Sequence, residues 1–166
     1  MAVAALQHLQ PVQPNSALLF DLDLPELKSA RARAPQLAYS GNVTPLEAWA
    51  LVEQRAAVLV DVRTTEERKF VGYVPGSVAV PWLIGTAMQT NPRFVRELEA
   101  KVPKDVVILM LCRSGQRSAA AAASATKAGF QNVYNVLEGF EGDLDSNRQR
   151  GHQNGWRHQG LPWIQE

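Results

Sequence analysis

The only cysteine of this 166-residue chain, Cys112, lies in a loop whose residue types favour nucleophilic chemistry. The loop runs to Ser118, between a run of apolar residues and a run of alanines. If the apolar run is a strand and the alanines form a helix, the first N–H groups of that helix have no partner within it and point into the loop. Together with the helix dipole and the side chains of Arg113 and Arg117, they favour negative charge on the cysteine sulfur. We therefore expect a thiolate nucleophile at Cys112.

The residues that follow the cysteine are the candidate anion-binding loop. Gly115 permits the tight curl in which successive backbone N–H groups converge on one point. A helix dipole contributes up to ~2 kcal/mol to an anion at a partly buried helix start, and a nearby arginine adds to this at an intermediate dielectric. These contributions stabilise a thiolate without a general base, and no histidine lies near this loop in the sequence. The loop residues are Arg113, Ser114, Gly115, Gln116, Arg117 and Ser118.

Two other interpretations of these residues stay open. A lone cysteine after the apolar run that ends at Leu111 is, by residue type, often an inert core residue. Arg113 and Arg117 are also candidates for pairing with nearby carboxylates rather than with a substrate.

The length of the loop narrows the chemistry. Cysteine phosphatases that hold phosphate at a helix start use the spacing Cys-x5-Arg, whereas Cys112 and Arg117 have the spacing Cys-x4-Arg. A ring that is one residue shorter is tighter around the cysteine sulfur. It accommodates one additional atom on that sulfur more readily than a tetrahedral oxyanion, so we expect the cysteine to carry sulfur as a persulfide.

Strands and helices alternate around this loop. Thr44-Pro45-Leu46-Glu47 has the spacing of a capping box with proline at the first helical position, and Thr64 to Glu67 repeats the capping-box spacing. The alternation predicts an α/β fold with a central, mainly parallel sheet that has helices on both faces. The expected strands are 58–62, 78–80, 106–111 and 133–137, and the expected helices end near Arg55 and Phe70, begin at Asn91, and run from Ser118 to Ala128.

The first 40 residues differ from the rest of the chain. They contain four prolines and show no long periodic pattern, although residues 18–24 favour a short element. We expect regular structure to begin at Thr44, which divides the chain into a partly irregular N-terminal extension, 1–40, and a domain, 41–166. Within the domain, residues 141–154 form a polar insertion, which we expect to be an exposed loop, with a lid over the site as the alternative.

Four motifs in this order resemble those of single-domain rhodaneses. The resemblance covers about residues 43–163 and implies the rhodanese-like fold and a sulfurtransferase activity. The motifs are Asp61-Val62-Arg63 with Glu67, Gly72 to Ser77, the loop Cys112 to Ser118, and Gly129 to Gly139.

The resemblance implies a transfer in two steps. Cys112 would take a sulfane sulfur from thiosulfate or a related donor, and a thiol or cyanide acceptor would then remove it. Because Cys112 is the only cysteine, no second cysteine of the chain can resolve the persulfide. One alternative is a persulfide carrier or docking module that hands sulfur to a partner protein. Another is phosphatase or arsenate reductase activity, which the loop length disfavours.

The resemblance also implies roles for residues outside the loop. It gives Asp61 a supporting role in ordering the active-site region, and it places Arg63 beside it, where a strand-end salt bridge and a substrate role are equal alternatives. Glu67 is expected to be the third helical residue of its capping box rather than a catalytic acid. Tyr73 stands where many rhodaneses have histidine, so any role of that imidazole is absent.

Composition excludes several other classes of protein. Hydrophobic residues make up 46% and charged residues 20% of the chain, which predicts a folded domain. A net charge of +1 provides no global field for nucleic acid or an anionic membrane. One cysteine excludes an internal disulfide and a CxxC zinc site. We expect no metal, no cofactor, no nucleic-acid or membrane partner, and a cytoplasmic location.

Overall fold

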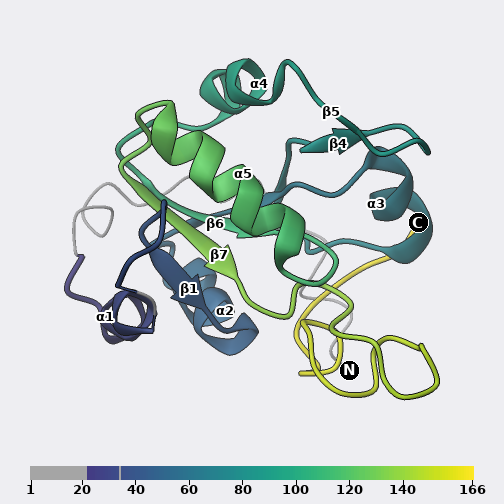
Figure 1. Ribbon diagram of the computed structural model, residues 1–166. Coiled ribbons are helices and arrows are strands. Elements are labelled where there is room, and N and C mark those ends of the chain that lie inside the picture. Colours follow the sequence, from purple (N-terminus) through teal and green to yellow (C-terminus); the bar gives the residue numbers. More distant parts are fainter. Residues whose placement is uncertain (1–21, 34) are drawn as a thin grey trace.

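A five-stranded sheet, parallel throughout, forms the centre of the molecule (Figure 1). The computed structural model describes residues 22–33 and 35–166. The strand order is β1-β7-β6-β2-β3, so β6, which leads into the cysteine loop, lies in the middle. The expected α/β fold with a mainly parallel sheet is confirmed. The strands are β1 (Gly41–Val43), β2 (Val58–Asp61), β3 (Val78–Ala79), β6 (Val107–Leu111) and β7 (Asn132–Val136).

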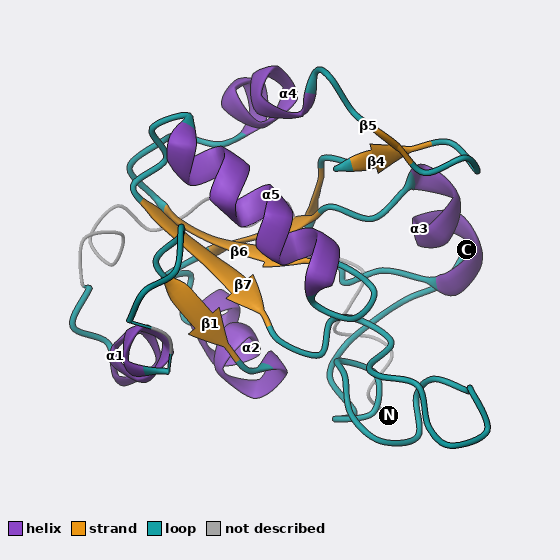
Figure 2. Cartoon of the chain, in the orientation of Figure 1, coloured by secondary structure: helices purple, strands orange, loops and turns teal. Residues whose placement is uncertain are grey.

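Helices cover both faces of this sheet (Figure 2). The capping boxes predicted at Thr44 and Thr64 are both present, with the side chain of each threonine accepting from the third helical N–H. A small separate hairpin pairs β4 (Leu83–Ile84) with β5 (Gln89–Thr90). The helices are α1 (Pro25–Ala32), α2 (Pro45–Glu53), α3 (Thr65–Val71), α4 (Phe94–Lys101) and α5 (Gln116–Lys127).

The residues of β6 alternate between two hydrophobic cores, one on each face of the sheet. Because successive side chains of a strand point to opposite faces, Leu109 and Leu111 pack on the side of α1 and α2. Ile108, Met110 and then Cys112 point to the side of α4 and α5. The cysteine side chain therefore lies on the same face of the sheet as the helix that begins after its loop.

Regular structure begins before Thr44, so the prediction that it starts there is wrong. Helix α1 buries Leu27 and Ala30 in the core on the α2 side. Strand β1 pairs with β7 at the edge of the sheet, and a Cβ on Gly41 would lie only 2.5 Å from the carbonyl oxygen of Ala30. A short helix and a strand of three residues are stabilised mainly by tertiary contacts, which a local pattern does not report. Of the short element expected at 18–24, residues 18–21 lie outside the described part of the chain.

Two predicted helix starts are displaced. Helix α4 begins at Phe94 rather than Asn91, because the Asn91 side chain accepts from the Arg93 N–H in a turn that precedes the helix. Helix α5 begins at Gln116, earlier than the expected Ser118, because Gly115 caps it in the left-handed conformation. The earlier start brings the first turn of α5 into the cysteine loop.

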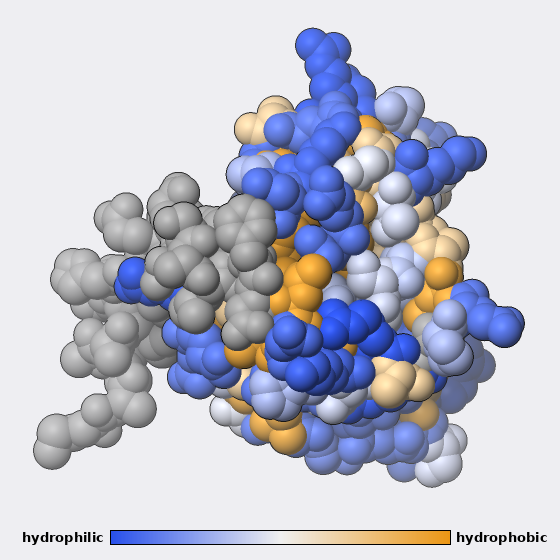
Figure 3. All heavy atoms as spheres, turned by 90° about the vertical axis from the view of Figure 1, so that its left-hand side faces the viewer, coloured by the Kyte–Doolittle hydropathy of each residue, from blue (hydrophilic) through white to orange (hydrophobic). Residues whose placement is uncertain are grey.

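The polar insertion, residues 141–154, is an irregular surface loop. Contacts within the insertion hold it: the Asp143 N–H donates to Asn154 Oδ1 at 2.8 Å, and His152 Nδ1 lies 2.7 Å from Asp145 Oδ2. Among the described residues on the face seen in Figure 3, polar ones predominate and apolar ones reach the surface in smaller groups. Within residues 22–33 and 35–166, no helix has the length and apolar character that crossing a membrane requires.

Candidate active site

Cys112 directly follows β6 and points into the first turn of α5. Its sulfur accepts a hydrogen bond from the backbone N–H of Gly115 at 3.1 Å and lies 3.1 Å from Ser118 Oγ. The residue is only 1% exposed. The sulfur thus borders the apolar core on the α4 and α5 side, but its polar contacts come from the loop and the helix start.

The loop has its curl because Gly115 adopts a left-handed backbone, with φ +95°. A side chain at Gly115 would also crowd Glu138 N at 3.3 Å. Behind the loop, the buried faces of Ala121, Ala122 and Ala125 let α5 lie close to the sheet. The small side chains of the helix therefore help to hold its N-terminus against the end of β6.

Arg117 is engaged by a carboxylate on another element. Its Nη1 and Nη2 donate to the two carboxylate oxygens of Glu67, each at 2.7 Å. These hydrogen bonds raise the pKa of Arg117 although burial opposes the shift. Burial would raise the pKa of Glu67, but hydrogen bonds from Arg117 and Thr64 hold it below its usual range. Arg117 therefore ties α5 to α3, whereas the side chain of Arg113 is exposed on the loop.

A turn that follows β7 supports the other side of the cysteine loop. The Phe140 N–H donates to the Cys112 carbonyl at 2.8 Å, and the Glu141 N–H donates to the Arg113 carbonyl at 3.0 Å. Gly139 approaches so closely that a Cβ there would lie 2.5 Å from the Ser114 nitrogen. The backbone of the turn is thus in direct contact with the backbone of the loop.

Comparison with known proteins agrees with this arrangement. Residues 44–145 match the family described as "Rhodanese-like domain". The chain belongs to this family. It is 37% identical over 115 residues to the uncharacterized protein RP600 of Rickettsia prowazekii, covering 68% of this chain and 87% of that protein. It is 31% identical over 103 residues to "Thiosulfate sulfurtransferase/rhodanese-like domain-containing protein 3" of Mus musculus, covering 60% of this chain and 66% of that one.

A solved structure is also similar. The crystal structure of Rv0390 from M. tuberculosis superposes with a TM-score of 0.70 at 45% identity, covering 77% of this chain and 99% of that one. The rhodanese-like fold is therefore established for this chain. The family includes sulfurtransferases, so the chain is of the sulfurtransferase-family kind.

In this rhodanese-like domain, Asp61 lies on the strand next to the cysteine strand. It pairs in register with Leu111, directly before Cys112. Its carboxylate binds Arg63 through Nη2 at 2.7 Å and Arg68 through Nη1 at 2.8 Å, and the side chains of Asp61 and Arg63 are 0% exposed. Of the two alternatives for Arg63, the structure contains the strand-end salt bridge.

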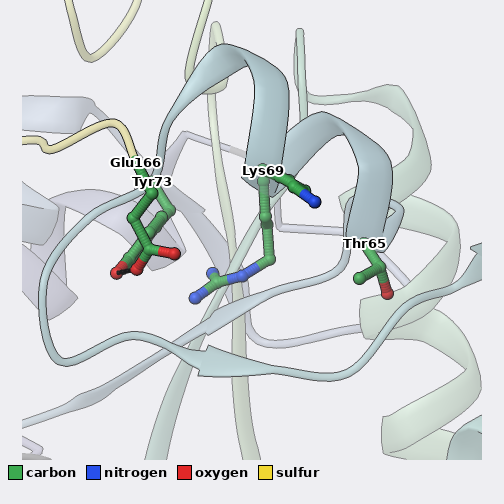
Figure 4. A pocket seen from close by; sticks show the side chains of 5 residues that line it. Thr65, Lys69, Tyr73 and Glu166 are labelled. Carbon is green, nitrogen blue, oxygen red and sulfur yellow. Dashed lines mark hydrogen bonds between the residues drawn. The ribbon is translucent and has the colours of Figure 1, made fainter.

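Tyr73 lines an open surface pocket of about 440 Å³ on the α3 side of the molecule. Its hydroxyl donates to Glu166 Oε1 at 2.7 Å, and the two side chains lie together in Figure 4. Cys112 is not among the lining residues, which are Thr65, Arg68, Lys69, Tyr73 and Glu166. Tyr73 thus belongs to a pocket that the cysteine does not line.

Sequence reasoning missed one residue of the site, Asn135. It is buried on β7, and its Oδ1 accepts from Ser118 Oγ at 2.6 Å. A signal was present, because Asn135 is a polar residue within the β-forming stretch Val133 to Val136. It is unfavourable for a polar side chain to be buried there without a partner.

Proposed function

We propose that this rhodanese-like domain is a sulfurtransferase that carries a sulfane sulfur as a persulfide on Cys112. The observation that supports the proposal is the Cys112 sulfur at the N-terminus of α5, 3.1 Å from the Gly115 nitrogen and 3.1 Å from Ser118 Oγ. Hydrogen-bond donors at a helix start stabilise an anion. The proposed reaction passes between a thiolate and a persulfide anion, so both states of Cys112 in the cycle carry negative charge.

In the first step, the Cys112 thiolate attacks the sulfane sulfur of thiosulfate or a related donor. A sulfur–sulfur bond forms at Cys112 while the donor's sulfur–sulfur bond breaks, and sulfite leaves with the electron pair. In the second step, cyanide or a thiolate attacks the outer sulfur, and Cys112 leaves as the thiolate. Each step conserves atoms, electrons and charge, so the cycle needs no added oxidant or reductant.

The loop residues have distinct roles in this proposal. The N–H groups of the loop, from Arg113 to Arg117, face the charge on the outer sulfur. Arg113, exposed on the loop, attracts the anionic donor. Arg117, held by Glu67, positions α5 and adds positive charge beside the site. Asp61 orders Arg63 and Arg68 at the adjacent strand end.

The decisive experiment is the intact mass of the reduced chain before and after thiosulfate. We expect a gain of one sulfur atom that a thiol removes, together with steady formation of thiocyanate from thiosulfate and cyanide. Cys112→Ser should abolish both results and leave the thermal melting curve unchanged. A reduced wild-type chain with neither adduct nor turnover would reject the proposal.

The carrier alternative gives a different pattern in the same experiment. A carrier would gain the sulfur atom but form almost no thiocyanate, and it would release the sulfur only to a particular protein. The 1% exposure of Cys112 favours testing this possibility, since a small acceptor has to reach the outer sulfur through the loop.

A further inference from the structure

A buried chain of hydrogen bonds leads from the Cys112 sulfur to Asn135 on β7. Ser118 Oγ lies 3.1 Å from Cys112 Sγ and 2.6 Å from Asn135 Oδ1. Ser118 is 0% and Asn135 is 3% exposed. Because water does not compete at such depth, each donor and acceptor in this chain matters.

Further contacts describe the orientation of the Asn135 amide. Its Nδ2 donates to Asn42 Oδ1 at 3.2 Å, and the Tyr39 hydroxyl donates to the same oxygen at 3.3 Å. In these contacts the Asn135 nitrogen faces Asn42 and its oxygen faces Ser118. Both the Cys112 sulfur and Asn135 Oδ1 therefore lie within reach of the Ser118 hydroxyl as acceptors.

A serine hydroxyl has only one hydrogen to donate. While Ser118 gives it to Asn135, its oxygen faces the Cys112 sulfur as an acceptor, which suits a protonated thiol. A thiolate has no hydrogen to give. For the thiolate, Ser118 must turn its hydrogen to the sulfur, and Asn135 Oδ1 loses that donor. Asn135 and the thiolate thus compete for one hydrogen.

We propose that Asn135 is a positioning residue that sets, through the Ser118 hydroxyl, the balance between the empty thiolate and the sulfur-loaded Cys112. The part that concerns loading rests on the proposed function. When Cys112 carries sulfur, the charge lies on the outer sulfur and Sγ becomes a weaker acceptor. Ser118 then returns its hydrogen to Asn135. Asn135 therefore opposes the free thiolate and favours the loaded state.

The first test is the rate at which iodoacetamide alkylates Cys112 in the full chain as a function of pH, which needs no sulfur donor. Asn135→Ala should lower the midpoint of this pH profile by about one unit, equivalent to ~1.4 kcal/mol. Ser118→Ala should raise the midpoint, because the thiolate loses a donor. In the Ser118→Ala background, Asn135→Ala should have no effect on the midpoint.

Matched variants separate this role from a structural one. Asn132→Ala on the same strand and Ser124→Ala on the same helix should leave the midpoint unchanged. Asn135→Asp should raise it, because a carboxylate holds the Ser118 hydrogen more strongly and repels the thiolate. This variant also tests the inference if Asn135→Ala does not fold. The inference would be overturned if Asn135→Ala and Ser118→Ala shifted the midpoint in the same direction. It would also be overturned if Asn135→Ala still shifted the midpoint in the Ser118→Ala background.

The second test measures loading by intact mass at fixed ratios of thiosulfate to sulfite. Above the midpoint pH, Asn135→Ala should lower the loading constant about tenfold, the equivalent of one pH unit. An unchanged constant would overturn the part of the inference that concerns loading. If the wild-type chain takes up no sulfur, the proposed function fails, while the alkylation profiles still decide whether Asn135 controls the thiolate.

Discussion

Glu67 performs two tasks with one carboxylate. As the third residue of α3, it accepts from the Thr64 N–H at 3.0 Å, and it also receives both hydrogen bonds from Arg117. The first task stabilises the start of α3 and the second connects α3 to the helix that follows the cysteine loop. The residue that caps one helix thus positions another.

The ion pair makes the stability of the fold depend on pH through Glu67. Its pKa in the folded chain lies below the ordinary value of 4.5, so its contribution is complete above that pH and is lost as the pH falls through the folded value. Glu67→Gln keeps the capping acceptor and removes the charge. We expect it to lower the free energy of unfolding by about 1 kcal/mol at neutral pH, and by much less at a pH well below 4.5.

Urea denaturation at neutral and acidic pH measures this difference. Glu66→Gln is the matched control, because Glu66 lies in the same helical turn with an exposed side chain. If Glu67→Gln lowered the free energy of unfolding by the same amount at both pH values, the charge on Glu67 would not contribute to stability.

Sequence reasoning at this scale succeeded where partners are neighbours in the chain. The capping role of Glu67 follows from its distance to Thr64, three residues away. The ion pair with Arg117 spans 50 residues, and the contact of Ser118 with Asn135 joins a helix to a strand. Such partners are brought together by the fold, so a local pattern reveals that they need partners but not which ones.

At the scale of elements, the cysteine loop depends on a neighbouring turn. Gly139 in that turn has φ +66°, and its missing side chain makes room for the backbone of Arg113 and Ser114. Gly160 has nearly the same backbone, φ +68°, but no heavy atom lies within 4 Å of the position a Cβ would take. Substituting each glycine by alanine therefore distinguishes the effect of backbone strain, which both positions share, from the effect of crowding the loop, which only position 139 has.

We expect Gly139→Ala to impair both stability and reactivity of Cys112. Left-handed strain costs about 1–2 kcal/mol in either alanine variant, and crowding should add about 1–3 kcal/mol at position 139 alone. The rate of Cys112 alkylation should change for Gly139→Ala and stay unchanged for Gly160→Ala. Equal effects of the two substitutions on stability and alkylation would contradict a supporting role of the turn.

Strand β6 was predictable because its residues are apolar without interruption. The hairpin of β4 and β5 was not, since each strand has two residues. The start of α5 was displaced because Gly115, expected within the loop, is the N-cap of the helix. Short elements and helix ends are decided by tertiary contacts and backbone conformation, which are weakly encoded locally.

At the scale of the whole molecule, α1 is part of the folded core. Leu27 is 0% exposed, and the Arg31 guanidinium donates to the Tyr134 hydroxyl on β7 at 3.1 Å. The family match begins at residue 44, beyond this helix. Sequence reasoning placed α1 in a partly irregular extension because eight residues with two buried positions make no long pattern.

The contribution of α1 can be measured by removing one side chain. Leu27→Ala should lower the free energy of unfolding by about 2–5 kcal/mol, as for other buried leucines. Leu22→Ala, at a residue that is 37% exposed, should have little effect and serves as the control. Chemical denaturation measures both variants. If Leu27→Ala and Leu22→Ala lowered the free energy of unfolding by the same small amount, α1 would not contribute to the stability of the fold.

The depth of Cys112 also limits what oxidation can do to this protein. A disulfide needs two sulfur atoms at about 2 Å and backbones within about 7 Å of each other. With the sole thiol 1% exposed behind its loop, two copies of the chain do not reach that separation while both stay folded. The fold therefore protects its thiol from covalent dimerisation.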